Sequence, residues 1–299
     1  MAFKNLFIES NVRLSVKNEQ LVVLNNEEHT IPLEDINSIC IDSLRTNITT
    51  YTLNKIVEHD IILYVCDEKH LPKGMLLSVN NYSRKLRNLK RQIEMPKPVL
   101  KRMWQSIVMQ KIENQALVLK ELEYYDSYKE LKLISNKVLS GDSTNMEAVA
   151  AAIYFKTIFG KDFSRKNADL YNSCLNYGYA IVRGMISRSL VMYGFEPALG
   201  IFHHNQLNAF NLADDIIECF RPLVDLYVLK NVTIKDELDS DTKRVIYNLI
   251  NILILIDGKS YNIQTAIENV VKSLATSFEN KSNDIKLPVL NGLKEYRYA

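Results

Sequence analysis

The chain has 299 residues, and its 37 Lys and Arg nearly balance its 35 Asp and Glu, which gives a formal net charge of +2. A content of 47% hydrophobic and 24% charged residues is typical of a globular protein and argues against disorder over most of the length. The small net charge argues against a uniformly basic nucleic-acid coat protein, but it does not exclude a local basic patch.

The same composition bears on where the protein works. The longest apolar stretch, residues 249–256, is interrupted by Asn251 and falls far short of the ~20 residues that cross a bilayer. The first residues lack the apolar core of a signal peptide. Four widely spaced cysteines favour buried, reduced thiols. We therefore expect a soluble, cytoplasmic protein with no membrane partner.

In chain order, short segments rich in β-branched residues come first and predict strands. They cover residues 6–8, 12–16, 21–24, 29–33, 36–41, 61–66 and 74–79. A single helix is predicted over residues 50–59, where Leu53, Ile56 and Val57 share one face. These elements predict a small, mostly-β N-terminal domain over residues 1–85.

After Pro96 and Pro98 the apolar residues recur at three-and-four spacing, which predicts helices. The predicted helices cover residues 99–119, 147–159, 173–193, 212–229, 241–255 and 265–278. We expect a larger, all-helical C-terminal domain over residues 99–299, joined to the first domain by a basic linker at 86–98. The expected fold class is α+β.

The junction between the two domains is strongly basic. Residues 84–102 hold eight cations and a single anion, Glu94. This run is either a solvated linker and helix face or a strip that contacts DNA phosphates. The candidate DNA-binding residues are Arg84, Lys85, Arg87, Lys90 and Arg91.

The only adjacent histidines, His203 and His204, are followed by the carboxylates of Asp214, Asp215 and Glu218. Imidazole beside several carboxylates is the ligand set expected for Mn²⁺ or Mg²⁺. Helical spacing places the three carboxylates opposite the apolar face of the 212–224 segment. The alternative is a solvated acidic face on which Arg221 pairs with a carboxylate.

Glu147 also has two interpretations. It ends the T-x-x-E sequence at 144–147, which is the pattern of a helix capping box. In that role its carboxylate would only reach back to a backbone N–H. A ligand role remains open from the local sequence.

Four stretches together resemble the Cas1 family, the integrases of CRISPR adaptation, in the form found in type II systems. They are GDSTNMEAVAAAIYF at 141–155, LNYGYA at 175–180, LGIFHH at 199–204 and LADDIIECFRP at 212–222. The resemblance implies a β domain followed by a helical domain that holds one divalent metal.

Carried over residue by residue, the resemblance implies that Glu147, His203 and Glu218 are the catalytic metal ligands, with Mg²⁺ or Mn²⁺ as cofactor. Asp215 becomes an adjacent acidic helper, and His204 a neighbouring or substrate-facing residue. Where many members have Pro, this chain has Cys219, which replaces no ligand.

The implied reaction is a DNA transesterification in antiviral defence. A 3′-hydroxyl of captured DNA attacks a phosphodiester at the edge of a CRISPR repeat, and an endonuclease activity uses the same site. The implied partners are double-stranded DNA, a second copy of the chain, a dimer of the small ferredoxin-like Cas2 protein, and the RNA-guided effector nuclease as a further candidate. The alternatives are a metal-dependent structure-specific repair nuclease and a non-enzymatic DNA-binding scaffold.

Overall fold

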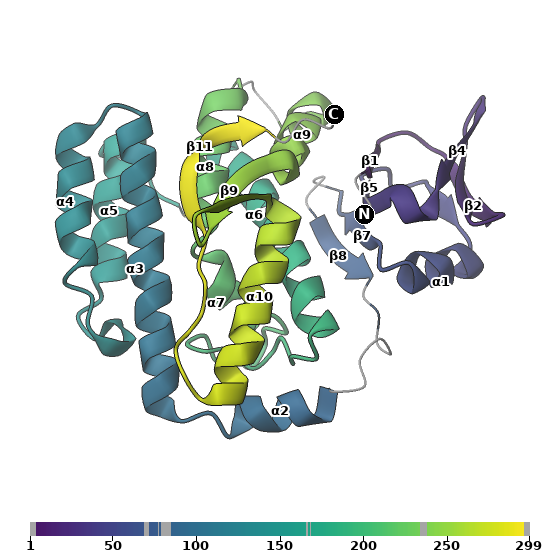
Figure 1. Cartoon of the computed structure of the whole chain (residues 1–299). Coiled ribbons are helices and arrows are strands. Elements are labelled where there is room, and N and C mark those ends of the chain that lie inside the picture. The colour runs from purple at the N-terminus through teal and green to yellow at the C-terminus, as the bar shows by residue number, and fades with distance from the viewer. Residues whose placement is uncertain are drawn as a thin grey trace. The chain divides into compact units, whose positions relative to one another are not determined.

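The structure is a computed structural model that describes residues 4–68, 72–76, 78, 85–165, 167, 169–233 and 238–295. The chain divides into two compact units, Met1–Asn81 and Tyr82–Ala299. The expected α+β class, strand-rich first and helical second, is confirmed (Figure 1). Within the described residues, no helix combines the length and the apolar character that a bilayer crossing requires.

The described residues of the first unit form two four-stranded sheets and one helix, α1 (Thr50–Glu58). One sheet has the order β1-β5-β7-β8, and the other has the order β4-β3-β2-β6. The strands are β1 (Lys4–Ile8), β2 (Arg13–Lys17), β3 (Gln20–Leu24), β4 (Glu28–Pro32), β5 (Ile36–Ile41), β6 (Asn47–Ile48), β7 (Ile62–Cys66) and β8 (Pro72–Leu76).

Local sequence explains these elements. Asn18 and Glu19 join β2 to β3 with positive φ angles of 51° and 56°, as a tight two-residue hairpin turn requires. The Thr49 side chain accepts a hydrogen bond from the Thr52 N–H and caps α1. Apolar residues that alternate along the strands, together with Ile56 of α1, form the hydrophobic core of this unit.

The second unit contains nine α-helices among its described residues. They are α2 (Lys85–Ile93), α3 (Lys97–Glu121), α4 (Tyr125–Ser135), α5 (Met146–Phe159), α6 (Leu170–Met192), α7 (Asn211–Ile217), α8 (Arg221–Asn231), α9 (Ser240–Tyr247) and α10 (Ile263–Asn280). In Figure 1 the long helix α3 lies alongside α4 and α5.

This unit is not entirely helical. A small antiparallel sheet, in the order β10-β9-β11, packs against α10. Its strands are β9 (Ile252–Ile256), β10 (Lys259–Asn262) and β11 (Val289–Glu295). The helix predicted over 241–255 therefore ends at Tyr247. The alternating segment ILILI followed by Asp257 and Gly258 forms a hairpin instead, because both turn residues adopt positive φ.

Two further expectations differ from the structure. The helix predicted over 212–229 is interrupted between Ile217 and Arg221, because Pro222 starts a new helix and cannot continue an old one. Residues 86–98 are not an extended linker. They form most of α2 and the start of α3 within the second unit, which begins near Tyr82.

Candidate active site

A buried lysine joins two of the predicted site residues. Lys111 lies on α3 among core residues, and its side chain is 10% exposed. Its Nζ donates to Glu147 Oε1 at 2.5 Å and also to a carboxylate oxygen of Glu218. Glu147 belongs to the first turn of α5, whereas Glu218 directly follows α7. Two carboxylates from distant parts of the chain thus converge on one cationic group.

Glu218 is the most deeply buried member of this group, with a side chain that is 8% exposed. Arg221 Nε donates to its second oxygen at 2.8 Å. Burial alone would raise the pKa of Glu218, but the positive charges of Lys111 and Arg221 outweigh it and lower this pKa to about 2. Glu218 is therefore a carboxylate at every physiological pH.

Glu147 does not close a capping box. The Asp142 carboxylate accepts the N–H groups of Met146 and Glu147 at 2.8 and 3.0 Å and so satisfies the start of α5. The N-cap residue is Asn145, which has a φ of 54° and makes no side-chain cap hydrogen bond. The Glu147 side chain is thereby left to face Lys111.

His203 is held by a buried carboxylate. Its Nδ1 lies 2.6 Å from Asp215 Oδ1, and Asp215 also accepts the backbone N–H groups of Ile201, Phe202 and His203. The hydrogen bond that Asp215 accepts from the His203 ring raises the pKa of His203 despite its partial burial. The second ring nitrogen, Nε2, is therefore the atom through which His203 can coordinate a metal ion.

A close backbone approach makes this arrangement possible. A Cβ atom on Gly200 would lie 2.2 Å from the carbonyl oxygen of His203 and 2.8 Å from Asp215 Oδ2. Only glycine fits there. The carboxylates near His203 are thus not a solvated face: Asp215 is fully buried, and Asp214 is engaged by Arg183 at 2.5 and 2.9 Å.

A second acidic group lies behind Glu218. Asp225 is 1% exposed and accepts the phenol O–H groups of Tyr154 (3.0 Å) and Tyr179. The guanidinium of Arg221 stacks over the Tyr179 ring at 4.5 Å. Tyr179, Arg221 and Asp225 border a cavity of about 170 Å³ that is also lined by Lys111, Glu147 and Glu218.

The site offers ligand atoms that suit a divalent metal. Two carboxylates and an imidazole match the ligands that Mg²⁺ or Mn²⁺ accepts, and both carboxylates already face a positive charge. As the side chains stand, no three His, Cys, Asp or Glu within the described residues are close enough to hold a metal, and the Lys111 ammonium lies between the two glutamates.

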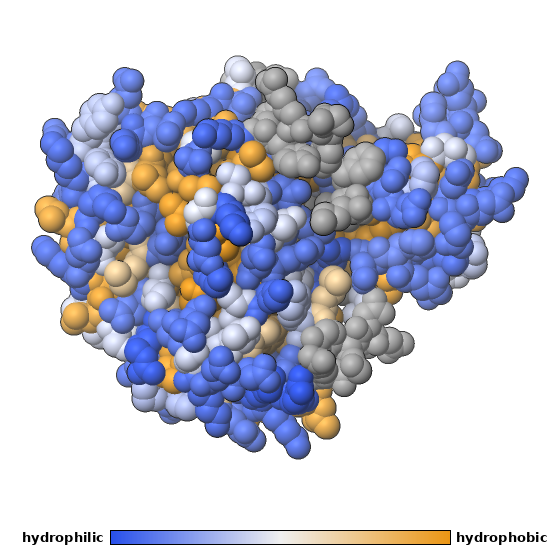
Figure 2. Space-filling view, in the orientation of Figure 1, coloured by the Kyte–Doolittle hydropathy of each residue, from blue (hydrophilic) through white to orange (hydrophobic). Residues whose placement is uncertain are grey.

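The remaining predicted residues lie elsewhere. His204 is exposed and lines a different cavity. Arg87 and Lys90 are exposed on α2, where the surface in Figure 2 is mostly hydrophilic, but Arg91 pairs with Glu279 at 2.5 Å. Arg84 and the side chain of Lys85 lie outside the described residues.

Sequence reasoning missed Lys111 and the acceptor role of Asp225. The sequence did contain a signal for Lys111. This residue lies four positions after Ile107 and four before Gln115, on the buried face of α3. A lysine at a core position is uncommon unless it is paired. Asp225 gave no such signal, since its two tyrosine partners come from other helices.

Buried charges and a histidine fixed by a carboxylate are typical of an enzyme site rather than of a structural helix face. Comparison with known proteins gives the family. The family model "CRISPR associated protein Cas1" matches residues 6–244, and the chain belongs to the Cas1 family. It is therefore an enzyme of that family.

The curated relatives include the CRISPR-associated endonuclease Cas1 of Neisseria meningitidis serogroup C, which is 40% identical over 303 residues and matched over 100% of both chains. A second, CRISPR-associated endonuclease Cas1 1 of Francisella tularensis subsp. novicida, is 24% identical over 94% of this chain and 97% of its own.

Solved structures share the fold. A Cas1 protein from Thermotoga maritima matches with a TM-score of 0.74 at 15% identity, over 94% of this chain and 99% of its own. A casposase bound to integration product has the same TM-score at 19% identity, over 95% and 92%. A chain of a Cas6-RT-Cas1–Cas2 complex gives 0.71 at 20% identity, with 94% of this chain but only 35% of that one covered.

Proposed function

We propose that this protein joins the 3′-hydroxyl ends of captured DNA to a CRISPR repeat by transesterification, and that it cleaves DNA at the same site. The proposal is supported by the family, by the N. meningitidis relative named as an endonuclease, and by the fold shared with a casposase bound to integration product. The type II form of the family stays part of the proposal.

The observation that carries the proposal is the convergence of Glu147 and Glu218 on one cationic group, with His203 fixed nearby by Asp215. Glu147, Glu218 and His203 would hold Mg²⁺ or Mn²⁺. When bound, such an ion stabilises negative charge on the attacking and leaving oxygens of a phosphodiester.

The chain's own residues prepare the site for this chemistry. Arg221 keeps Glu218 ionised and oriented, since it donates to the oxygen that Lys111 leaves free. Asp215 fixes the ring of His203 through Nδ1, so that Nε2 is presented in one orientation. Such preorganisation avoids a reorganisation cost during the reaction.

Four partners belong to the proposal. They are double-stranded DNA, a second copy of the chain through the N-terminal unit, a Cas2 dimer and the effector nuclease, with the reaction in the cytoplasm. One of the related structures is a Cas6-RT-Cas1–Cas2 complex, which supports the Cas2 partner. Exposed cations on α2, among them Arg87 and Lys90, are the candidate contacts to DNA phosphates.

The test is an integration assay with the purified protein, Cas2, a fluorescent duplex, a supercoiled repeat plasmid and Mn²⁺ or Mg²⁺. Wild type should join the strands, and His203→Ala and Glu218→Gln should each abolish joining. Glu130→Gln on the exposed face of α4 is the matched control and should remain active. Joining that survives both substitutions contradicts the site, and cleavage without any joining favours a repair nuclease.

A further inference from the structure

Lys111 borders a cavity that has no part in the chemistry proposed above. The cavity has a volume of about 170 Å³, and Gln115, Tyr179 and Asp225 line it together with Lys111. It is smaller than the sites of most small ligands, which measure about 300–1,000 Å³. The end of a side chain fits such a space.

Gln115 brings an unused acceptor to this cavity. It lies on α3, one helical turn after Lys111, and is only 2% exposed. Its amide oxygen is buried and has no hydrogen-bond partner among the residues that the structure describes. A buried polar atom without a partner costs free energy, so it marks a position where a partner is expected. Because Gln115 lines the cavity, the cavity is where that partner has room.

Asp225 adds a carboxylate to the same cavity. Its hydrogen-bond donors are the neutral phenols of Tyr154 and Tyr179, and no ion pair between described residues includes it. Burial raises the pKa of Asp225 to about 6, which shows that its negative charge is poorly compensated. A positively charged hydrogen-bond donor would thus find two acceptors in the cavity, the Gln115 amide and the Asp225 carboxylate.

The two arginines that line the cavity already have other contacts. Arg221 donates to Glu218 at 2.8 Å. Arg165 lies over the Tyr179 ring at 5.3 Å. A guanidinium is planar and is held by such contacts in one orientation, whereas a lysine carries its ammonium on a flexible four-carbon stem. Lys111 is therefore the cation best suited to reach the two acceptors.

Metal binding gives Lys111 a reason to move. Its ammonium contacts both Glu147 and Glu218, the carboxylates proposed to hold a divalent ion. Two cations in one position repel each other, so the ammonium has to leave when the glutamates hold a metal. Residues four apart on a helix are neighbours, and rotation about the side-chain bonds of Lys111 can bring its Nζ to the amide of Gln115.

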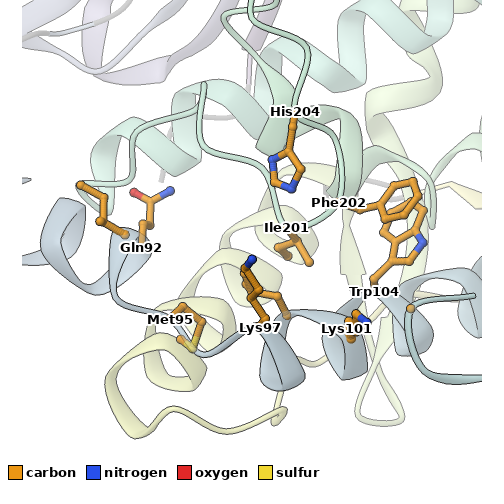
Figure 3. Close-up of a pocket in the computed structure, with 11 residues that line it drawn as sticks. Gln92, Met95, Lys97, Lys101, Trp104, Ile201, Phe202 and His204 are labelled. Atoms are coloured by element: carbon orange, nitrogen blue, oxygen red, sulfur yellow. The ribbon is translucent and has the colours of Figure 1, made fainter.

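Other destinations are less suitable for the ammonium. Figure 3 shows the larger cavity of about 440 Å³ beside Trp104 and His204. The described residues that line it include neither Lys111 nor any Asp or Glu. Access to solvent is also narrow, because the Lys111 side chain is only 10% exposed. The cavity next to Gln115 is the place that offers the ammonium both room and acceptors.

We propose that Lys111 has two positions. Without metal its ammonium lies between Glu147 and Glu218, and with metal bound it lies in the cavity and donates to Gln115 and Asp225. Gln115 is then a positioning residue, which acts on the metal centre through Lys111. This inference rests on the proposed function, because it takes the two glutamates as metal ligands. It adds that a residue outside the ligand set contributes to the metal affinity.

Gln115→Met tests the proposal, because methionine keeps the length of the side chain but lacks the amide oxygen. Calorimetric titration should show Mn²⁺ binding weakened about 10- to 100-fold, the range for loss of one hydrogen bond to a charged group. In EDTA the variant should resist urea at least as well as wild type, since that oxygen has no partner among the described residues. A purely structural role for Gln115 predicts the reverse: lower stability in EDTA and unchanged Mn²⁺ affinity.

Gln110→Met is the matched control. Gln110 lies on the same helix but is not among the described residues that line the cavity, so this variant should bind Mn²⁺ as wild type does. Equal Mn²⁺ affinities of Gln115→Met and Gln110→Met would overturn the proposal.

A double-mutant cycle shows whether the effect passes through Lys111. In the Lys111→Met background, Gln115→Met should no longer change the Mn²⁺ affinity, because no ammonium is left to accept. The same fold loss in both backgrounds would contradict the proposal.

A crystal structure of the full chain with Mn²⁺ shows the position of Lys111 directly, even if Lys111→Met does not fold. Its Nζ should lie within hydrogen-bond distance of Gln115 and Asp225. An Nζ that still lies between the two glutamates beside bound Mn²⁺ would refute the inference. Wild type that binds no Mn²⁺ refutes the proposed metal centre and this inference with it, whereas Mn²⁺ binding that is insensitive to Gln115 refutes this inference alone.

Discussion

At the scale of single residues, Lys111 holds the two glutamates of the candidate site together when no metal is bound. Its ammonium is the only described group that contacts both Glu147 and Glu218. Removing one partner of a buried charged cluster leaves the other charges uncompensated. We expect Lys111→Met to lower the free energy of unfolding by about 3–5 kcal/mol in EDTA, measured by urea denaturation.

Added Mn²⁺ should reverse much of this loss, because a divalent ion can take over the neutralisation of the two glutamates. The rise in Tm on adding Mn²⁺ should thus be larger in Lys111→Met than in wild type. The control is Lys230→Met, which removes an exposed pair with Glu121 and should cost less than about 1 kcal/mol. A Tm response to Mn²⁺ equal to that of wild type would show that Lys111 and the metal do not share a site.

Asp225 gives a prediction for pH. Burial raises the pKa of Asp225 to about 6, although the hydroxyls of Tyr179 and Tyr154 act in the opposite direction. The folded protein therefore binds this proton more tightly than the unfolded chain does. The stability from this group is present below pH ~4 and is lost as the pH rises through about 6, by about 3 kcal/mol in all.

Asp225→Asn should remove this pH dependence, since an amide does not titrate. The measurement is the free energy of unfolding of wild type and variant at several pH values between 4 and 7.5. The stability of wild type relative to Asp225→Asn should fall as the pH rises from 4 to 7.5. A difference that is constant over this range would mean that Asp225 titrates near its ordinary value.

The residues of the candidate site differ in how far the sequence could predict them. His203, Glu147 and Glu218 were predicted because they fall within motifs of the Cas1 family. Lys111 lies outside those motifs, and its role depends on α3 passing between α5 and the end of α7. Asp215 was predicted as an acidic residue adjacent to the metal ligands. Its hydrogen bonds to the His203 ring and to the backbone N–H groups of residues 201–203 are specified by no sequence pattern.

At the scale of elements, α2 is the clearest feature of the proposed DNA surface. Arg87 and Lys90 are exposed on it, whereas Arg91 is engaged by Glu279. The double variant Arg87→Glu and Lys90→Glu should weaken duplex binding and lower the slope of log K against log salt by about 1.8, or 0.9 per phosphate contact. Fluorescence anisotropy at several salt concentrations measures both quantities.

Lys259→Glu is the control for this variant, because Lys259 is exposed on β10 in the same unit and lies outside the basic run. It should change the affinity only slightly and leave the slope as in wild type. If the α2 variant retains both the affinity and the slope of wild type, then α2 does not contact DNA.

Most elements could be predicted from periodicity, and each failure has its own local cause. The long helices α3, α6 and α10 carry repeated apolar spacing, and the strands of the first unit carry β-branched runs. The segment 252–256 is apolar throughout, so its period is ambiguous, and only its pairing with β10 and β11 decides for a strand. Helix α4 was not predicted, because the turns at its two ends carry no strong capping residues.

At the scale of the whole molecule, a net charge of +2 conceals an uneven distribution of charge along the chain. The basic run extends over α2 and the start of α3, while the carboxylates of the candidate site gather further along the same unit. All proposed metal ligands belong to the second unit, Tyr82–Ala299. Whole-chain charge was therefore too coarse a measure to exclude a DNA substrate.

The central claim is that Glu147, His203 and Glu218 form one metal centre. Calorimetric titration with Mn²⁺ tests it most directly, because it requires neither DNA nor a partner protein. We predict a single Mn²⁺ site per chain in wild type and in Glu130→Gln, weakened roughly tenfold or more in His203→Ala and in Glu218→Gln. Mn²⁺ binding that is unchanged in both site variants would contradict the account.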